Sequence, residues 1–450
     1  MSEIQAEEYR ALPGAYFRLI FAFMIHPPQS TPSPTPQPDP PRPGRLLETE
    51  PAAYRPARRG RGARVNPTGR FERRRTVADL DALQPASPLD HDPDPEPEPD
   101  PDPEPHDPAS APEPAARTQL LPDPSRTALT FNRSPDIPFD ASLNPYRGCE
   151  HGCAYCYARP THEYLGYSAG LDFETKILVK QRAAELLRKE LSSPRWKPQV
   201  VAISGVTDAY QPLERKLELT RRCVEVFADF RNPIMIITKN ALVARDLDLF
   251  RRLAEHDAIS VSISLTTLDP ELARVLEPRA SAPQERLRAI ERLAAAGIPT
   301  GVMIAPIIPG LTDEETPALL EAAAAAGASH AGSIVLRLPH GLADLFDDWL
   351  LTHRPLRREK VLHRLESLRR GRLNDPRFGS RMRGEGRFAE QIADVFRLWA
   401  RRTGLDATRP ELSTAAFRRP GGVQLTLDLG PGPDPGPTPD PSGRGPAPVS

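Results

Sequence analysis

The chain has 450 residues, 55 of them proline, and a formal net charge of −1. The prolines are concentrated, with 26 at positions 27–125 and nine at positions 420–450. Because proline fixes φ and has no backbone N–H, these flanks exclude a single domain spanning the whole chain. About 290 residues remain between them, enough for one domain with its own core.

Membrane and secreted classes are also excluded. No apolar run reaches the roughly 18 residues that a membrane helix needs. The short apolar run at 16–25 has neither a basic start nor a small-residue cleavage site, so we expect no signal peptide. Three of the four cysteines lie within eight residues, which is unlike a secreted disulfide framework. We expect a cytoplasmic protein with no membrane partner.

The flanks differ in charge. We expect residues 1–126 to be a disordered, proline-rich region that contains a basic island at 55–75 and an acidic (Asp/Glu)-Pro run at 92–107. The acidic run has the composition of a stiff, solvated spacer. The island is either a solvated linker or an arm that contacts the phosphates of a nucleic acid. Residues 420–450 are expected to form a disordered tail rich in proline and glycine.

Between the flanks, strand and helix patterns alternate, which is the signature of βα units. Six such units predict an α/β fold: a partial (β/α)6 TIM-like barrel, with a core domain at 127–340. The expected strands are at 171–176, 200–204, 234–238, 259–265, 300–305 and 333–338. The expected helices are at 180–191, 217–230, 241–255, 283–296 and 317–326.

One strand carries a polar face. Ser260, Ser262 and Ser264 alternate with branched aliphatic residues, so the three hydroxyls share one side of the strand. That side faces either solvent or, in a parallel barrel covered on both faces, a polar ligand inside.

Residues 341–419 are expected to form a basic helical extension. Positions 351–402 contain fifteen Lys and Arg against six Asp and Glu. This excess indicates either solvated helix faces or a positive platform for a phosphate backbone.

The chemistry is concentrated in the cysteines. Cys149, Cys153 and Cys156 have the spacing C-x3-C-x2-C. Three close thiolates can bind three irons of a [4Fe–4S] cube and leave the fourth iron without a protein ligand, whereas ordinary ferredoxin cubes use four thiolates. A zinc site with His151 or His162 as fourth ligand is the structural alternative, although zinc ligand pairs are usually spaced C-x2-C.

This motif, with Tyr155 before the third cysteine, resembles the cluster motif of the radical S-adenosylmethionine (radical SAM) superfamily. The resemblance implies two cofactors, a [4Fe–4S] cluster and S-adenosylmethionine (SAM). It also implies an electron donor such as a flavodoxin or ferredoxin, reductive cleavage of SAM, and a 5′-deoxyadenosyl radical that abstracts hydrogen from the substrate. Tyr155 occupies the aromatic position that in the family lies against the adenine.

Downstream residues extend the resemblance toward the spore photoproduct lyase-like ("DNA repair photolyase") branch and an uncharacterised bacterial subgroup. Ser204, Thr207 and Asp208 stand at the strand end where the superfamily binds the methionyl amine of SAM. Lys239 resembles the lysine of that lyase which reaches SAM. Ser264 resembles the serine that meets the SAM ribose or carboxylate.

One departure limits this resemblance. The lyase uses an extra cysteine as hydrogen donor where this chain has Gly205, so repair of spore photoproduct is not supported. The remaining thiol, Cys223, is interpreted as a core residue rather than a displaced donor. Tyr210 is the other candidate donor, although its family position suggests packing in the SAM pocket.

Three further residues are candidates at strand ends. Arg337 and His340 flank Leu338 and Pro339 at the C-terminal end of the last expected strand, where barrel active sites gather, and are candidate substrate-binding residues. Glu277 is expected to form a structural ion pair with Arg279.

The sequence therefore predicts a radical SAM enzyme acting on a nucleic acid or nucleotide. The alternatives are a radical SAM enzyme that modifies a protein or small metabolite, and a non-catalytic iron–sulfur or zinc module.

Overall fold

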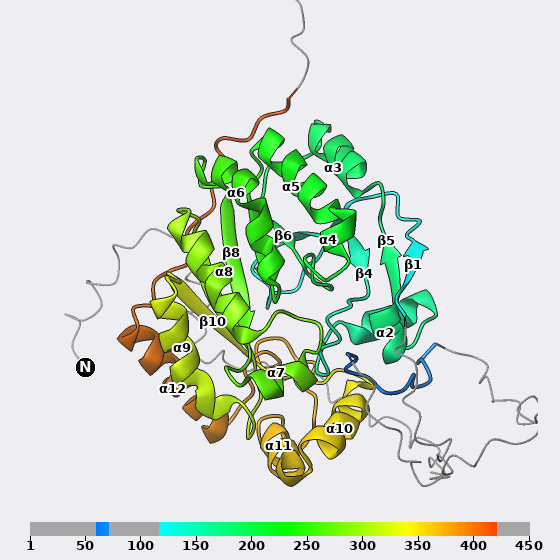
Figure 1. Cartoon of the computed structure of the whole chain (residues 1–450), viewed down its shortest axis with the longest axis vertical. Helices are drawn as coiled ribbons and strands as arrows, with labels where there is room; N and C mark the ends of the chain where they lie inside the picture. Colours follow the sequence, from blue (N-terminus) through cyan, green and yellow to red (C-terminus); the bar gives the residue numbers. More distant parts are fainter. Residues whose placement is uncertain (1–59, 72–116, 421–450) are drawn as a thin grey trace, which may run out of the picture. The chain divides into compact units, whose positions relative to one another are not determined.

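The computed structural model describes residues 60–71 and 117–420 (Figure 1). The expected acidic run at 92–107, both ends of the basic island and the tail beyond residue 420 lie outside the described residues. Within the described part of the chain, no helix is long and apolar enough to cross a membrane.

The main sheet has seven strands in the order β10-β9-β8-β7-β6-β3-β2. Six of them are parallel, and each pairs with the next parallel strand in the chain, while β2 is antiparallel to β3. This sequential order of six parallel strands confirms the predicted partial (β/α)6 architecture. The strands are β2 (Leu129–Phe131), β3 (Ala141–Leu143), β6 (Val201–Ile203), β7 (Ile234–Thr238), β8 (Ile259–Leu265), β9 (Thr300–Ile307) and β10 (His330–Val335).

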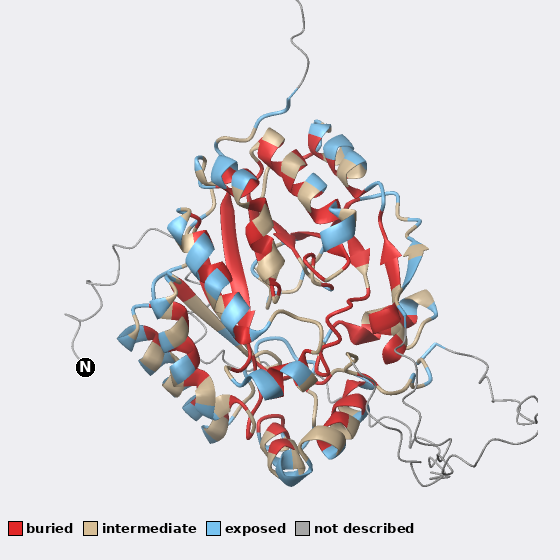
Figure 2. Cartoon of the chain, in the orientation of Figure 1, coloured by how far each residue is buried: buried red, intermediate tan, exposed pale blue. Residues whose placement is uncertain are grey.

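Helices cover the outside of this sheet (Figure 1). Figure 2 shows buried residues along the strands and along one side of the surrounding helices, as expected for amphipathic helices packed on a sheet. The outer helices are α3 (Ala183–Ser192), α5 (Leu219–Phe230), α6 (Leu247–Ala254), α8 (Pro283–Ala295) and α9 (Thr316–Ala325). Shorter helices lie in the connections: α4 (Glu214–Leu217), η6 (Ala241–Asp246), α7 (Pro270–Leu276) and η7 (Asp313–Glu315).

The serine face of β8 is covered. Ser260, Ser262 and Ser264 are only 2%, 2% and 3% exposed, so the interpretation of this face as solvent-facing is wrong. All seven residues of β8 are buried, as expected for a strand in the middle of a parallel sheet.

The first predicted strand is wrong. Residues 171–175 form the helix α2 (Leu171–Thr175), and the following strand β5 (Lys176–Val179) belongs to a separate small sheet. In that sheet β5 lies between β1 (Gln119–Pro122) and β4 (Tyr146–Arg147). The first barrel strand is instead β3, whose three residues are too few to show a periodic pattern.

The last predicted strand is shifted. β10 begins three residues before the predicted strand at 333–338, and its pairing with β9 is irregular between Ser333 and Val335. Such an irregularity interrupts the period of two on which a strand prediction rests.

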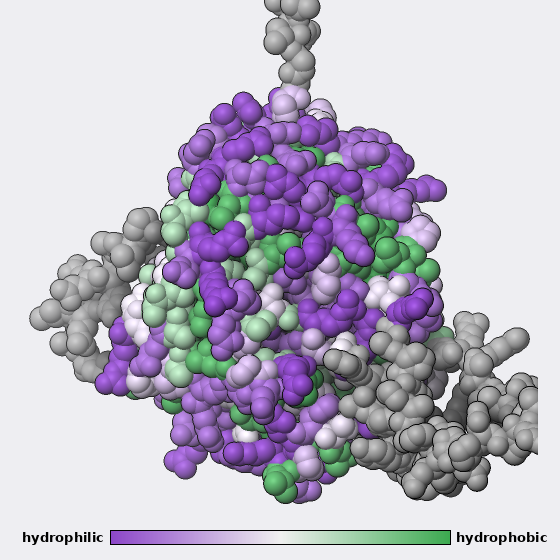
Figure 3. All heavy atoms as spheres, in the orientation of Figure 1, coloured by the Kyte–Doolittle hydropathy of each residue, from purple (hydrophilic) through white to green (hydrophobic). Residues whose placement is uncertain are grey.

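The C-terminal part is helical, as predicted, but many of its cations have acidic partners. Arg358 lies 2.6 Å from Asp347, and Arg364 lies 2.8 Å from Asp313. Figure 3 shows mostly hydrophilic residues, with smaller hydrophobic areas, on the visible face of the molecule. The helices are α10 (Leu342–His353), α11 (Pro355–Ser367) and α12 (Arg387–Arg402).

A buried carboxylate joins the small sheet to the barrel. Glu214, at the start of α4, has no exposed surface and accepts hydrogen bonds from the Tyr146 hydroxyl, the Thr220 backbone N–H at 3.0 Å and the Arg245 guanidinium at 2.9 Å. A buried polar group without a hydrogen-bond partner lowers the stability of the fold, so loss of the Glu214 carboxylate would also affect the groups that donate to it.

Glu214→Ala is expected to lower the free energy of unfolding in urea by about 1–3 kcal/mol, because it leaves the buried Tyr146 hydroxyl unpaired and removes one of the carboxylates beside Arg245, another being Asp246. The matched control is Glu225→Ala on α5. That carboxylate is 45% exposed and lies 3.6 Å from Arg221, so its loss should change the free energy by less than about 0.5 kcal/mol. Equal stabilities of the two variants would contradict this assignment.

Candidate active site

The three cysteines lie in the loop between β4 and the 3-10 helix η5 (Arg159–Leu165), here called the cluster loop. Cys149 and Cys153 are 6% and 7% exposed, and Cys156 is partly exposed. Cys156 packs both in the apolar group that holds Cys149 and in the group that holds Cys153. All three are free thiols, and Cys156 packs with both of the others.

The three buried thiols suit a metal cofactor that binds thiolates and is shielded from water. Burial raises the pKa of all three, while Lys239 acts in the opposite direction on Cys153 and Cys156. Thiols are therefore the stable form without a metal, and metal binding must release their protons. Among the described residues, no group of three His, Cys, Asp or Glu side chains could hold a single metal ion, whereas the thiolates of a cube each bind a different iron.

The loop after β6 supports the cluster loop. The Thr207 hydroxyl donates a 2.6 Å hydrogen bond to the carbonyl of Gly148, directly before the first cysteine. The Ser204 hydroxyl accepts from the Ala209 N–H at 2.9 Å, and Ser204 has φ = +85°. A residue other than glycine at such a φ is strained and must be held by its surroundings.

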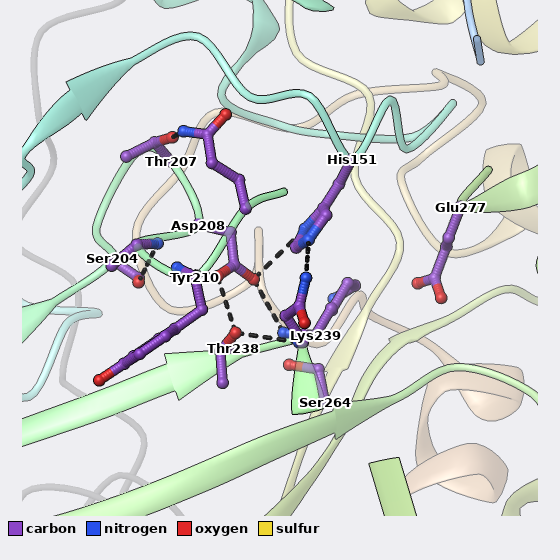
Figure 4. Close-up of polar contacts among 12 residues, drawn as sticks. His151, Ser204, Thr207, Asp208, Tyr210, Thr238, Lys239, Ser264 and Glu277 are labelled. Carbon is purple, nitrogen blue, oxygen red and sulfur yellow. Dashed lines mark hydrogen bonds and ion pairs between the residues drawn. The ribbon is translucent and has the colours of Figure 1, made fainter. Parts of the chain in front are cut away.

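Asp208 connects three segments (Figure 4). Its carboxylate accepts from the Thr238 hydroxyl at 2.7 Å and from the Lys239 backbone N–H at 2.8 Å, both at the end of β7. It also lies 3.5 Å from Nδ1 of His151 in the cluster loop. Asp208 therefore holds the ends of β6 and β7 against the cluster loop.

A second part of the site consists of three neighbouring side chains, those of Lys239, Tyr155 and Glu277. The Lys239 ammonium donates to the Ala305 carbonyl at 3.2 Å and lies 5.8 Å from the centre of the Tyr155 ring. The Tyr155 hydroxyl donates to Glu277. Burial opposes ionisation of Glu277, but Arg286 and then Lys239 lower the pKa of this carboxyl to about 2. It is therefore a fixed negative charge that orients Tyr155.

The expected pairing of Glu277 with Arg279 is wrong. Glu277 pairs with Arg286, which also donates to the Ser264 carbonyl at 3.0 Å, and Arg279 lies 3.0 Å from Glu150. The sequence did contain a signal for Arg286. It lies on the buried stripe of α8 that continues with Ala289, Ile290 and Leu293, and a buried cation requires a buried partner.

Arg286 also fixes the position of Ser264. This serine is the second-last residue of β8 and is 3% exposed, and its carbonyl lies against the Arg286 guanidinium. Figure 4 shows Ser264 below Lys239, on the same side of the site.

Neither candidate hydrogen donor lies with these residues. Tyr210 is fully buried, and its hydroxyl donates to Asp246 at 3.0 Å, away from His151 and Lys239 (Figure 4). Cys223 is a fully buried core residue of α5, as interpreted from the sequence. Gly205 is not required sterically, because an added Cβ would meet Ser142 only at 3.5 Å.

The two candidate substrate residues have different surroundings. Tyr157 directly follows the third cysteine, and its half-exposed ring has its centre 4.8 Å from the Arg337 guanidinium. Arg337 forms no hydrogen bond or ion pair with another described residue. Burial lowers its pKa. His340 is exposed, and its charged neighbours are Arg70 and Glu163. The structure thus joins Arg337, and not His340, to the cluster loop.

Comparison with known proteins agrees with this geometry. Residues 143–323 match the family model described as the radical SAM superfamily. The chain is 40% identical over 249 residues to the uncharacterized protein Rv2578c of Mycobacterium tuberculosis, which covers 55% of this chain and 72% of that protein. It is 30% identical over 189 residues to the radical SAM Nalpha-GlyT isomerase of Pseudomonas phage M6, covering 41% of this chain and 37% of that one.

A solved structure is also similar. Spore photoproduct lyase complexed with dinucleoside spore photoproduct aligns with a TM-score of 0.47 and 17% identity, over 63% of this chain and 79% of that one. The family match confirms the resemblance indicated by the cysteine motif. The chain belongs to the radical SAM superfamily, whose cofactors are a [4Fe–4S] cluster and SAM.

Proposed function

We propose that this protein is an enzyme that binds a [4Fe–4S] cluster through Cys149, Cys153 and Cys156 and cleaves SAM reductively. The observation that supports this most directly is the packing of three free thiols in one loop beside Tyr155. When bound, the cluster and SAM supply an electron and a 5′-deoxyadenosyl radical that removes hydrogen from a substrate.

The surrounding residues receive distinct roles in this proposal. Tyr155, held by Glu277, presents its ring to the adenine, and Lys239 and Ser264 complete the wall on which SAM binds. Ser204 and Thr207 shape the strand end, because the Ser204 hydroxyl bonds within its own loop and the Thr207 hydroxyl bonds to the cluster loop. Both Asp208 oxygens accept from neighbouring groups, so we assign Asp208 to positioning.

The substrate is proposed to be a nucleic acid or nucleotide. Arg337 is a cation with no acidic partner among the described residues, and it stacks on Tyr157 next to a cluster cysteine. A guanidinium binds phosphate through charge-assisted hydrogen bonds, and an exposed aromatic ring stacks on a base. The pair offers both contacts at one place.

Cys153→Ala is expected to abolish formation of 5′-deoxyadenosine, because a cube held by two thiolates loses iron. The assay is anaerobic reconstitution with iron and sulfide, followed by dithionite, SAM and chromatography of the products. Cys223→Ala is the matched control, since this thiol lies in the α5 core, and it should retain both iron and product.

If the wild-type protein assembles the cluster but never cleaves SAM, it is a non-catalytic iron–sulfur module and the proposed enzyme is refuted. If it takes up zinc in preference to iron and sulfide, the cluster is refuted too.

Arg337→Ala is expected to weaken binding of a fluorescent single-stranded oligodeoxynucleotide by about tenfold, the loss of one charge-assisted contact. The slope of the logarithm of the binding constant against the logarithm of the salt concentration should decrease by about the contribution of one phosphate contact. Arg288→Ala is the control, because Arg288 is exposed on α8 and pairs with Glu285.

SAM cleavage without oligonucleotide should be the same in both arginine variants. Oligonucleotide binding that is absent, or equal in wild type and Arg337→Ala, would direct attention to a protein or small metabolite as the substrate.

A further inference from the structure

Residues 60–71, here called the strap, pack against the cluster loop although they precede it by about eighty residues. Figure 1 shows this segment, in blue, between α2 and α10. The backbone N–H groups of Gly62 and Ala63 donate to the Glu174 carboxylate at 3.0 and 2.8 Å. The carbonyl of Val65 accepts from the Leu171 N–H at 3.1 Å. The backbone of the strap thus forms hydrogen bonds with α2.

The contact with the cluster loop is too close for side chains. A Cβ at Gly62 would stand 1.8 Å from the carbonyl oxygen of Gly152, which lies between the first two cysteines. Gly170, the residue before α2, meets the strap in the same way, because a Cβ there would stand 2.1 Å from the carbonyl oxygen of Val65. Val65 itself packs against the apolar group that contains Cys153. Backbone therefore lies directly on backbone over this side of the loop.

Glu174 links the strap to a cluster ligand. It has no exposed surface, and besides the two strap N–H groups it accepts from the Arg159 guanidinium. Arg159 is 1% exposed and donates to the carbonyl of Cys153 at 3.0 and 2.9 Å. One carboxylate therefore neutralises the arginine that fixes Cys153 and at the same time binds the strap.

The arginines of the strap also have partners within the protein. Nε of Arg64 lies 2.9 Å from Asp348 on α10, and Arg70 pairs with Glu163 of η5. Arg61 donates to the Glu174 carbonyl at 2.8 Å. This part of the basic island therefore presents its charge to the protein's own carboxylates and carbonyls, as a docked segment does.

We propose that the strap is a cover of the cluster loop that keeps water and dioxygen from the Cys153 side of the cluster, with Glu174 as its positioning residue. This inference rests on the proposed cluster. The shell around a metal centre controls solvent access, and residues behind the ligands set their orientation. A cover held by backbone contact on both sides performs both tasks.

Gly62→Ala in the full-length, reconstituted protein tests the cover. The added methyl group must lift the strap from Gly152, so the visible absorbance of the cluster should be lost about tenfold faster in air-saturated buffer than in wild type. Gly69→Ala is the matched control in the same strap, because its Cβ would meet Glu163 at 3.9 Å, an ordinary contact. It should bleach at the wild-type rate.

Two further measurements separate the cover from a general loss of structure. Trypsin should cut the strap faster in Gly62→Ala than in Gly69→Ala, while the thermal midpoints stay close. Glu174→Gln, which keeps the shape but removes the charge paired with Arg159, should change the electron paramagnetic resonance signal of the reduced cluster as well as the bleaching rate.

The inference is overturned if Gly62→Ala exposes the strap to trypsin but its cluster bleaches at the wild-type rate. A wild-type protein that takes up no iron and sulfide refutes the proposed function instead, and the cover with it.

Discussion

The buried pair formed by Arg159 and Glu174 is the interaction on which the candidate site depends. The loop that carries the three thiols is neither a helix nor a strand, so its buried backbone groups need partners from elsewhere. Arg159 supplies them to the carbonyls of Cys153 and Gly170 and would be an uncompensated buried charge without Glu174. The Arg159–Glu174 pair therefore supplies hydrogen bonds that the loop cannot form within itself.

Buried ion pairs of the same kind occur elsewhere around the barrel. Arg286 with Glu277 fixes the wall behind Tyr155, and Arg245 with Glu214 ties the start of α4 to the small sheet. Buried pairs of this kind contribute little net stability compared with well-packed apolar residues, but removing one partner is costly. The protein thus separates two tasks. Apolar strands and helices supply the core, and buried charge pairs set the conformation of the loops at the strand ends.

Sequence reasoning found what is local and periodic. The strands from β6 to β9 and their helices followed from alternation and amphipathicity, and the cysteines, Tyr155, Asp208 and Lys239 followed from a motif and from strand ends. It missed β3 because three residues carry no period, and it placed a strand where α2 begins. It also missed Glu174, because its contacts with the strap span more than a hundred residues and leave no local pattern. Arg286 could have been found, since a cation on a buried stripe implies a partner.

The position of the strap in the chain has a consequence for biogenesis. The ribosome makes residues 60–71 before the cysteines and before Glu174, so the segment has no docking surface when it emerges. Its backbone can attach only once the cysteine loop and α2 have been made, which leaves an interval in which the cysteine loop is uncovered on that side. Iron–sulfur assembly machinery would have access during that interval, and closure would then mark the end of maturation.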